Sequence, residues 1–242
     1  MANKPVTIKT VWPDALQLAH AAAHLIVLES NLAVEKKGKF TLALSGGSTP
    51  KILFELLAQP PYKNNIPWKH VVVAFGDERF VAPTHEDSNY KMAIDILLRH
   101  VPIPKKNILA VPVLKITPTH SATLYEIQIR KYITAKNPFD LVLLGMGEDG
   151  HTASLFPKSE LLTESKRWIK EVWVAEKNMH RISFTFPLIN RSKNIVFLVT
   201  GSAKAPIVKK ILSGRGSAFP AAKVQAADNI YWFLDEAANG TS

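Results

Sequence analysis

Short, mostly apolar runs recur along the chain and predict buried strands. The clearest runs cover residues 39–44, 71–75, 140–144 and 194–199. Runs of this length suit strands buried on both faces of a parallel sheet, because helices cover such sheets above and below. Weaker runs predict further strands at residues 108–113, 173–176, 182–186 and 230–234.

Amphipathic segments lie between these runs and predict helices. In residues 14–29 apolar side chains return at helical spacing, as in Ala15, Ala19 and Ile26. Similar segments predict helices at 51–58, from Asp87 or Ser88 to about 101, at 121–133 and at 205–212. Strands alternating with helices predict a doubly wound, mainly parallel α/β sheet with helices on both faces, a Rossmann-like fold in a single domain of residues 1–242. Residues 237–242 are expected to form a frayed tail.

Composition narrows the class of protein. A chain of 242 residues with 47% hydrophobic composition suits one α/β domain with a sizeable core. It has no cysteine, which excludes disulfides, thiol nucleophiles and thiolate zinc sites. Lys4, Lys9 and Asp14 interrupt the apolar core that a signal peptide needs, and no run approaches the roughly 18 apolar residues of a membrane span. We therefore expect a soluble, cytoplasmic protein without a membrane partner, either a monomer or a weak homodimer.

The formal net charge of +10 raises the question of nucleic-acid binding. The lysines and arginines, however, are scattered in small groups beside predicted turns and helix ends, without interleaved aromatic residues. This distribution favours a solvated surface, so no nucleic-acid partner is predicted. The positive charge would still attract a small anionic substrate.

Polar, glycine-containing loops follow three of the predicted strands. The first loop consists of Ser45, Gly46, Gly47, Ser48 and Thr49 and leads into the helix at 51–58. Its glycines let the backbone approach a ligand closely, and the free amides of the helix start form an anion seat. It is not a Walker loop, because the spacing of the glycines and the following Lys-Ser/Thr pair are missing.

The other two loops carry the titratable groups. Asp77, Glu78 and Arg79 follow the strand at 71–75, and three charged residues there must face either solvent or a site because burial without partners is costly. The loop after the strand at 140–144 contains Gly147, Asp149 and then His151. Ligands of open α/β sheets bind at the carboxyl ends of the strands, so these loops predict the functional site.

Two other interpretations of the motifs have less support. Residues 145–150 match G-x-G-x-x-G, the dinucleotide fingerprint, but Pro157 would stop the helix that must follow, and Glu171 is poorly placed as a ribose-binding acid. His20 and His24 have a spacing that suits a metal, but no third ligand is near, so we interpret them as histidines on a helix surface. No cofactor and no metal are predicted.

The loops resemble those of the 6-phosphogluconolactonases. The similar stretches are L-S-G-G-S-T-P at 44–50, G-D-E-R-F-V at 76–81 with D-S-N-Y at 87–90, G-M-G-E-D-G-H-T-A-S-L-F-P at 145–157, R-I-S-F-T-F-P-L-I-N at 181–190 and V-T-G-S-A-K at 199–204. S-G-G-S-T-P alone is shared with the wider sugar-phosphate isomerase and deaminase superfamily. The chain departs from the family pattern near Phe75 and Gly76, where a tryptophan is frequent, and at Asn178 and Met179, where prolines are frequent.

The resemblance implies an enzyme that hydrolyses 6-phospho-D-glucono-1,5-lactone to 6-phospho-D-gluconate in the oxidative pentose phosphate pathway without a metal. It places a catalytic general base at His151, and histidine is the residue type most suited to proton exchange at neutral pH. Asp77 is the main candidate to orient the imidazole, the water or the substrate. Glu148 and Asp149 are weaker candidates, and backbone amides around Gly147 are candidates for the oxyanion.

The substrate's phosphate has its own set of expected ligands. Besides the residues of the 45–49 loop, the resemblance assigns Arg181 and Lys204 to phosphate binding, and Arg79 to either the phosphate or a sugar hydroxyl. The alternatives are a glucosamine-6-phosphate deaminase or aldose-ketose isomerase, and a non-catalytic sugar-phosphate sensor domain. The G-H-T-A-S stretch at 150–154 favours the lactonase, and no helix-turn-helix pattern precedes the phosphate loop.

Overall fold

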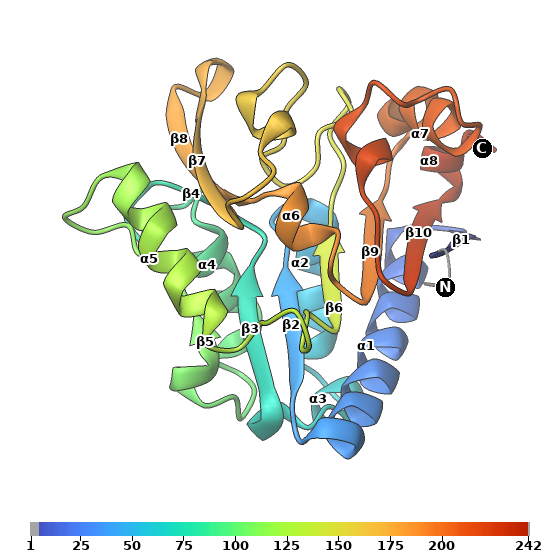
Figure 1. Ribbon diagram of the computed structural model, residues 1–242. Coiled ribbons are helices and arrows are strands. Elements are labelled where there is room, and N and C mark those ends of the chain that lie inside the picture. The colour runs from blue at the N-terminus through green and yellow to red at the C-terminus, as the bar shows by residue number, and fades with distance from the viewer. Residues whose placement is uncertain (1–4, 242) are drawn as a thin grey trace.

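A seven-stranded parallel sheet forms the centre of the protein, described here from a computed structural model of residues 5–241 (Figure 1). Residues 1–4 and Ser242, which the predicted domain and tail include, lie outside the described residues, so the domain bounds of 1–242 stay a prediction. The strand order is β1-β10-β9-β6-β2-β3-β5. The strands are β1 (Val6–Trp12), β2 (Phe40–Leu44), β3 (Val71–Phe75), β5 (Ile108–Leu109), β6 (Leu141–Leu144), β9 (Asn194–Val199) and β10 (Asn229–Asp235).

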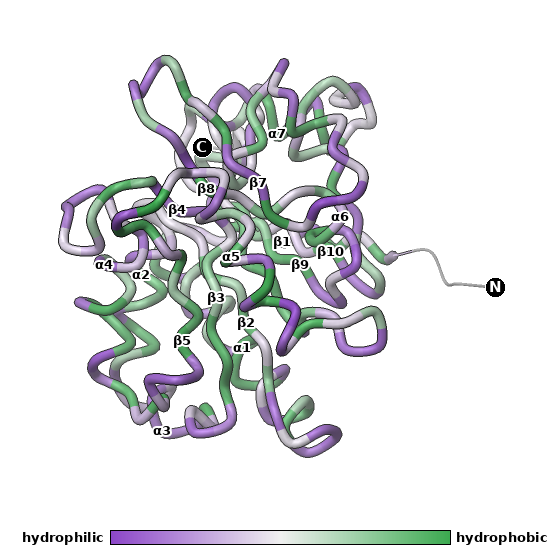
Figure 2. The backbone as a smooth tube through the Cα atoms, turned by 60° about the vertical axis from the view of Figure 1, so that its left-hand side comes forward, coloured by the Kyte–Doolittle hydropathy of each residue, from purple (hydrophilic) through white to green (hydrophobic). Residues whose placement is uncertain are grey.

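Burial explains why the apolar runs predicted these strands. Every residue of β2, β3, β6 and β9 is buried, because layers of helix cover both faces of the sheet. The tube in Figure 2 accordingly has hydrophobic segments along the sheet strands and hydrophilic loops at the outside. The predicted doubly wound α/β fold is confirmed.

Helices cover both faces of the sheet (Figure 1). They are α1 (Ala15–Lys37), α2 (Ser48–Leu57), α3 (Tyr62–Asn65), α4 (Asn89–Ala93), α5 (Pro118–Arg130), α6 (Phe186–Ile189), α7 (Ala205–Leu212) and α8 (Glu236–Asn239). Helix α1 runs beyond the predicted residue 29 because Ser30 and Ala33 continue its buried face, and it ends where Gly38 takes a φ of 75°. Among the described residues, no helix combines the length and the hydrophobicity needed to cross a bilayer.

A second, antiparallel sheet has the order β4-β8-β7 and lies beyond the carboxyl ends of the parallel strands, at the top of Figure 1. It consists of β4 (Asp77–Arg79), β8 (Met179–Phe184) and β7 (Ile169–Val174). In its register Asp77 pairs with Ser183 and Arg79 with Arg181. The sequence pattern did not separate these strands from the main sheet, because a three-residue strand of charged residues has no hydrophobic periodicity to recognise.

Several element bounds were wrong. The strand predicted at 173–176 ends at Val174, because Ala175–Lys177 form a tight turn that Asn178 closes at a φ of 48°. The strand predicted at 182–186 occupies Met179–Phe184, and the one at 108–113 shrinks to Ile108–Leu109.

The predicted tail differs from the structure, whereas the two histidines lie on the surface of a helix as predicted. Residues of the predicted tail form α8, which begins where the Asp235 carboxylate accepts the amide of Ala238 at 2.7 Å. His20 and His24 do lie on α1, but both rings contact the hydroxyl of Tyr62, at 2.8 and 3.1 Å. They therefore tie α1 to α3 in addition to facing the solvent.

Candidate active site

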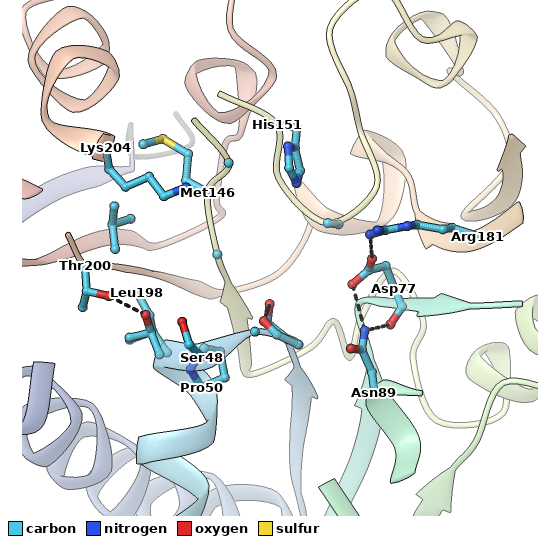
Figure 3. A pocket seen from close by; sticks show the side chains of 18 of the residues that line it. Ser48, Pro50, Asp77, Asn89, Met146, His151, Arg181, Leu198, Thr200 and Lys204 are labelled. Carbon is cyan, nitrogen blue, oxygen red and sulfur yellow. Dashed lines mark hydrogen bonds and ion pairs between the residues drawn. The ribbon is translucent and has the colours of Figure 1, made fainter. Parts of the chain in front are cut away.

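A cleft of about 350 Å³ opens at the carboxyl edge of the parallel sheet (Figure 3). The loops after β2, β3, β6 and β9 and one residue of β8 line it. The predicted residues that it brings together are Ser45, Gly46, Gly47, Ser48, Thr49, Asp77, Arg79, Gly147, His151, Arg181 and Lys204. Asp149 and the weaker candidate Glu148 do not line the cleft; Asp149 instead contacts the imidazole of His151.

The loop from Ser45 to Thr49 forms one wall of the cleft. Gly47 adopts a φ of 111°, which a side chain would strain, and this turn starts α2 at Ser48. No side chain caps the helix start, so its amides keep their donor capacity and its dipole favours an anion. Thr49 Oγ1 lies 2.7 Å from Thr200 Oγ1, which joins this wall to the loop after β9.

His151 and Asp149 form a close pair in the loop after β6. The imidazole Nδ1 lies 2.6 Å from Asp149 Oδ1, which also accepts the backbone amide of His151 at 3.0 Å. A carboxylate accepts only, so Nδ1 carries the proton and Nε2 keeps its lone pair. Figure 3 shows the His151 ring pointing into the cleft. Partial burial acts to raise the pKa of Asp149, but the hydrogen bonds from His151 and its charge more than offset this and lower the pKa.

Glycines shape the loop that carries this pair. A Cβ at Gly147 would stand 2.1 Å from His151 Nδ1, so only glycine lets the ring lie where it does. Gly150 has a φ of 77° and packs against Phe219. The centroids of the Phe156 ring and the His151 imidazole are 4.3 Å apart. The amide of Gly147 donates to the carbonyl of His151 at 2.9 Å. The Gly147 amide is therefore already engaged, and a role of the other backbone amides around Gly147 toward an oxyanion stays a prediction.

Asp77 occupies a different place from the one expected of an orienting acid. Its Oδ2 accepts the hydroxyl of Ser154 at 2.7 Å and lies 3.5 Å from Arg181 Nη1. Within residues 5–241, the carboxylate that bonds the imidazole is that of Asp149, which the sequence ranked as a weaker candidate. A role for Asp77 toward water or substrate stays a prediction.

Asn89 is a cleft residue that the sequence analysis interpreted only as part of a helix start. Its Oδ1 accepts Arg79 Nη1 at 2.8 Å, and its Nδ2 donates to the carbonyl of Asp77 at 2.9 Å. A Cβ at Gly46 would stand 2.0 Å from Asn89 Oδ1, so the loop from Ser45 to Thr49 packs directly on this amide. The sequence feature that could have identified Asn89 as a site residue is its position in the D-S-N-Y stretch, which resembles that of the 6-phosphogluconolactonases.

The two remaining cations enter the cleft from different sides. In Figure 3 Lys204 lies on the side of Ser48 and Thr200, and Arg181 lies beyond His151 next to Asp77. Lys204 Nζ is 3.7 Å from Glu148, the other weak acid candidate, whose side chain is 69% exposed. Because solvent screens such a pair, its attraction is weak, and the Lys204 ammonium group stays available to bind an anionic ligand.

After β6 the described chain forms no helix before the short turn Glu160–Thr163, so the G-x-G-x-x-G match at 145–150 lacks the helix that a dinucleotide site needs. Within the described residues, no group of three histidine, aspartate or glutamate side chains is placed to hold a metal ion.

The cleft combines an uncapped helix start with an imidazole that is paired with a carboxylate, at the edge where α/β sheets bind ligands. This arrangement defines the class as α/β enzymes that act on phosphorylated small molecules. Residues 13–232 match the family of glucosamine-6-phosphate isomerases and 6-phosphogluconolactonases. The chain belongs to this family and, within it, to the 6-phosphogluconolactonases, hydrolases of the pentose phosphate pathway.

Individual relatives agree with this assignment. A 6-phosphogluconolactonase of Nostoc sp. is 41% identical over 235 residues, covering 94% of this chain and 95% of that protein. The crystal structure of the 6-phosphogluconolactonase from Thermotoga maritima superposes with a TM-score of 0.84 at 26% identity, covering 95% of this chain and all of that one. A monomeric glucosamine-6-phosphate deaminase has a TM-score of 0.80 at 18% identity over 98% of this chain and 99% of that one, which shows a common fold alone.

Proposed function

We propose that the chain hydrolyses 6-phospho-D-glucono-1,5-lactone to 6-phospho-D-gluconate, with His151 as the general base and without a metal ion. The observation that carries this proposal is the pairing of His151 Nδ1 with Asp149 at 2.6 Å inside a cleft that also holds an anion seat. The pair leaves Nε2 as a proton acceptor directed at the cleft.

The two ends of the substrate match two parts of the cleft. Its phosphate is a dianion, and we assign it to the amides and hydroxyls of the loop from Ser45 to Thr49, where the start of α2 favours negative charge. Lys204 and Arg181 supply fixed positive charge from either side of this space. Arg79 is held by Asn89, and we assign it to the substrate without distinguishing phosphate from sugar hydroxyl.

The proposed reaction moves one proton through the imidazole. Nε2 of His151 takes a proton from water as the water oxygen bonds to the lactone carbonyl carbon, and the carbonyl oxygen becomes an oxyanion. When the oxyanion collapses, the bond from carbon to ring oxygen breaks and the imidazolium returns its proton to that oxygen. The carboxylate of Asp149 stabilises the imidazolium in between. The products are a hydroxyl and a carboxylic acid, which ionises at neutral pH.

The metal-free course of this reaction has chemical support. An imidazole with a carboxylate partner activates water at neutral pH, and the resulting imidazolium can protonate the ring oxygen as it leaves. We expect a chelator such as EDTA to leave kcat unchanged; a loss of activity that a divalent cation restores would contradict this part of the proposal. A cytoplasmic location and a monomeric or weakly dimeric state remain predictions from the sequence.

The decisive experiment supplies freshly generated 6-phosphogluconolactone and glucosamine 6-phosphate in separate assays. We expect the lactone to be consumed well above its spontaneous hydrolysis, and His151→Ala to lower kcat by about 100-fold or more with the fold intact. His70→Ala, at an exposed histidine near the other end of β3, serves as the control and should retain wild-type kcat. Deamination of glucosamine 6-phosphate would favour the alternative enzyme, and binding without turnover would favour a sensor.

A further inference from the structure

Glu78 is a buried acid that stands between two cleft residues without lining the cleft itself. Only 3% of it is exposed, and it lies on β4 between Asp77 and Arg79. Side chains alternate along a strand, so Asp77 and Arg79 face the cleft while Glu78 faces the opposite side. It borders a separate cavity of about 170 Å³ together with Tyr90, Val111 and Val113. The proposed reaction has no use for this carboxylate.

The carboxylate of Glu78 is occupied by donors from the chain around the cleft. Oε1 accepts the amides of Arg79 and Asn89, both at 2.8 Å. Oε2 accepts the amide of Tyr90 at 2.7 Å and the hydroxyl of Ser88 at 3.1 Å. Both oxygens therefore bind the segment at 88–90 to β4, and neither is paired with a cation in the described chain. Backbone amides are rigid donors, so this arrangement fixes the segment more firmly than flexible side chains would.

What the segment carries into the cleft is Asn89. Glu78 holds the backbone of Asn89. The side-chain Oδ1 of Asn89 accepts a hydrogen bond from Arg79 Nη1 at 2.8 Å, and its Nδ2 donates to the carbonyl of Asp77 at 2.9 Å. The same guanidinium nitrogen donates to the carbonyl of Asp87 at 2.7 Å. One partner of the Arg79 guanidinium, Asn89, thus belongs to the segment that Glu78 holds in place, and the other, Asp87, directly precedes that segment.

We infer that Glu78 is a positioning residue for substrate binding: its carboxylate clamps the segment at 88–90 so that Asn89 directs Arg79 into the cleft. Glu78 acts through these two residues and makes no contact with the substrate. The inference rests on the proposed function, because it takes Arg79 to face the bound lactone.

Stability gives an independent reason to expect a role beyond folding. Burial is the main cause that raises the pKa of Glu78, the amides of Tyr90, Asn89 and Arg79 lower it only in part, and the charge of Asp77 adds to the rise. A carboxyl whose pKa is raised on folding contributes stability below its unfolded pKa and loses that contribution as pH rises through the folded pKa. The burial of Glu78 therefore contributes no stability above its folded pKa.

The test is a set of kinetic measurements on the lactone. Glu78→Gln keeps the shape but replaces one accepting oxygen by an NH2 group, which cannot accept the amide or hydroxyl now bound there. We expect KM to rise by about 10-fold or more while kcat stays within about threefold, the pattern of weakened ground-state binding. Arg79→Gln should raise KM similarly, and the double variant should be no worse than Arg79→Gln alone, because both changes remove the same interaction.

Glu126 provides a matched control. It is also a buried glutamate whose Oε2 accepts backbone amides, those of Trp168 and Ile169 at 3.1 and 3.2 Å. Unlike Glu78 it is also paired with Arg130 and Arg167, and it lies on α5 away from the cleft. Glu126→Gln should lower Tm and leave KM unchanged. Should Glu78→Gln fail to fold, Glu78→Asp retains the charge on a shorter stem and should give an intermediate rise in KM.

Each outcome supports or overturns the inference. Wild-type KM in a folded Glu78 variant overturns it, and so does a double variant in which the two effects multiply. A wild-type chain that does not hydrolyse the lactone contradicts the proposed function instead. If the wild type is active and Arg79→Gln leaves KM unchanged, the assignment of Arg79 to the substrate fails, and the inference about Glu78 fails with it.

Discussion

Replacing Asp149 by asparagine tests the centre of the proposed mechanism. The side chain keeps its size, but the negative charge beside the imidazole disappears. Two opposite unit charges about 4 Å apart attract by about 1 kcal/mol in water and about 4 kcal/mol near a protein surface. Since the Asp149 and His151 side chains are 47% and 29% exposed, we take a value of about 2 kcal/mol after allowing for solvent screening.

This energy acts on the rate because the imidazole is charged only while it holds the proton from water. Losing about 2 kcal/mol of imidazolium stabilisation lowers kcat by about 30-fold. The asparagine NH2 group also favours the tautomer with its proton on Nε2, which removes the base, so 30-fold is a lower bound. KM should change little, because Asp149 does not line the cleft.

The assay follows the acid released from freshly generated lactone, with the spontaneous rate subtracted. Glu148→Gln is the matched control: it removes the neighbouring acid, whose partner is Lys204, and should leave kcat within about twofold. An Asp149→Asn variant with wild-type kcat would refute the idea that this carboxylate orients the imidazole of His151 and stabilises its protonated form. A loss confined to KM would place Asp149 in substrate binding instead.

Three further predictions concern other parts of the chain. Lys204→Ala should raise KM by about 10-fold with little change in kcat, whereas Lys209→Ala, on the exposed side of α7, should leave KM unchanged. If phosphate-free gluconolactone were hydrolysed as efficiently as the phosphorylated lactone, the proposed phosphate-binding site would be wrong. Gly147→Ala should lower kcat by about 100-fold at nearly unchanged Tm, because its Cβ would meet His151 Nδ1 at 2.1 Å; full activity would show that the ring position does not matter. Asp140→Asn should lower the free energy of unfolding, measured with urea at neutral pH, by about 3 kcal/mol, because the buried carboxylate binds Lys37 at 2.8 Å. The same substitution should leave kcat unchanged.

Asp140 also predicts how stability depends on pH. Burial acts to raise its pKa, but hydrogen bonds from Lys37, Lys193 and the amide of Thr41 more than offset this and lower the pKa. A lowered pKa means that the contribution to stability is present above the unfolded pKa and is lost as pH falls through the folded value. Acidification should therefore narrow the stability difference between the wild type and Asp140→Asn, and a difference that stays constant with pH would contradict this account.

The sequence by itself determined the fold class and nearly all of the cleft. Buried parallel strands need unbroken apolar runs, so β2, β3, β6 and β9 were recognisable, and the carboxyl ends of parallel strands share one edge. Loops that follow such strands must therefore meet, however far apart they are in the chain. This is why the sequence predicts that Ser45, Asp77 and His151 form one site.

Tertiary structure decided which of these side chains touch. Asp149, rather than Asp77, reaches the imidazole because the turn at Gly147 and Gly150 folds the loop back on itself, and no pattern of residue types encodes that direction. Likewise, Arg79 depends on Asn89 and Glu78, which meet only because β4 leaves the main sheet to pair with β8. Hydrophobic periodicity places strands within a sheet, whereas these contacts depend on hydrogen-bond geometry between loops, and that exists only in the folded chain.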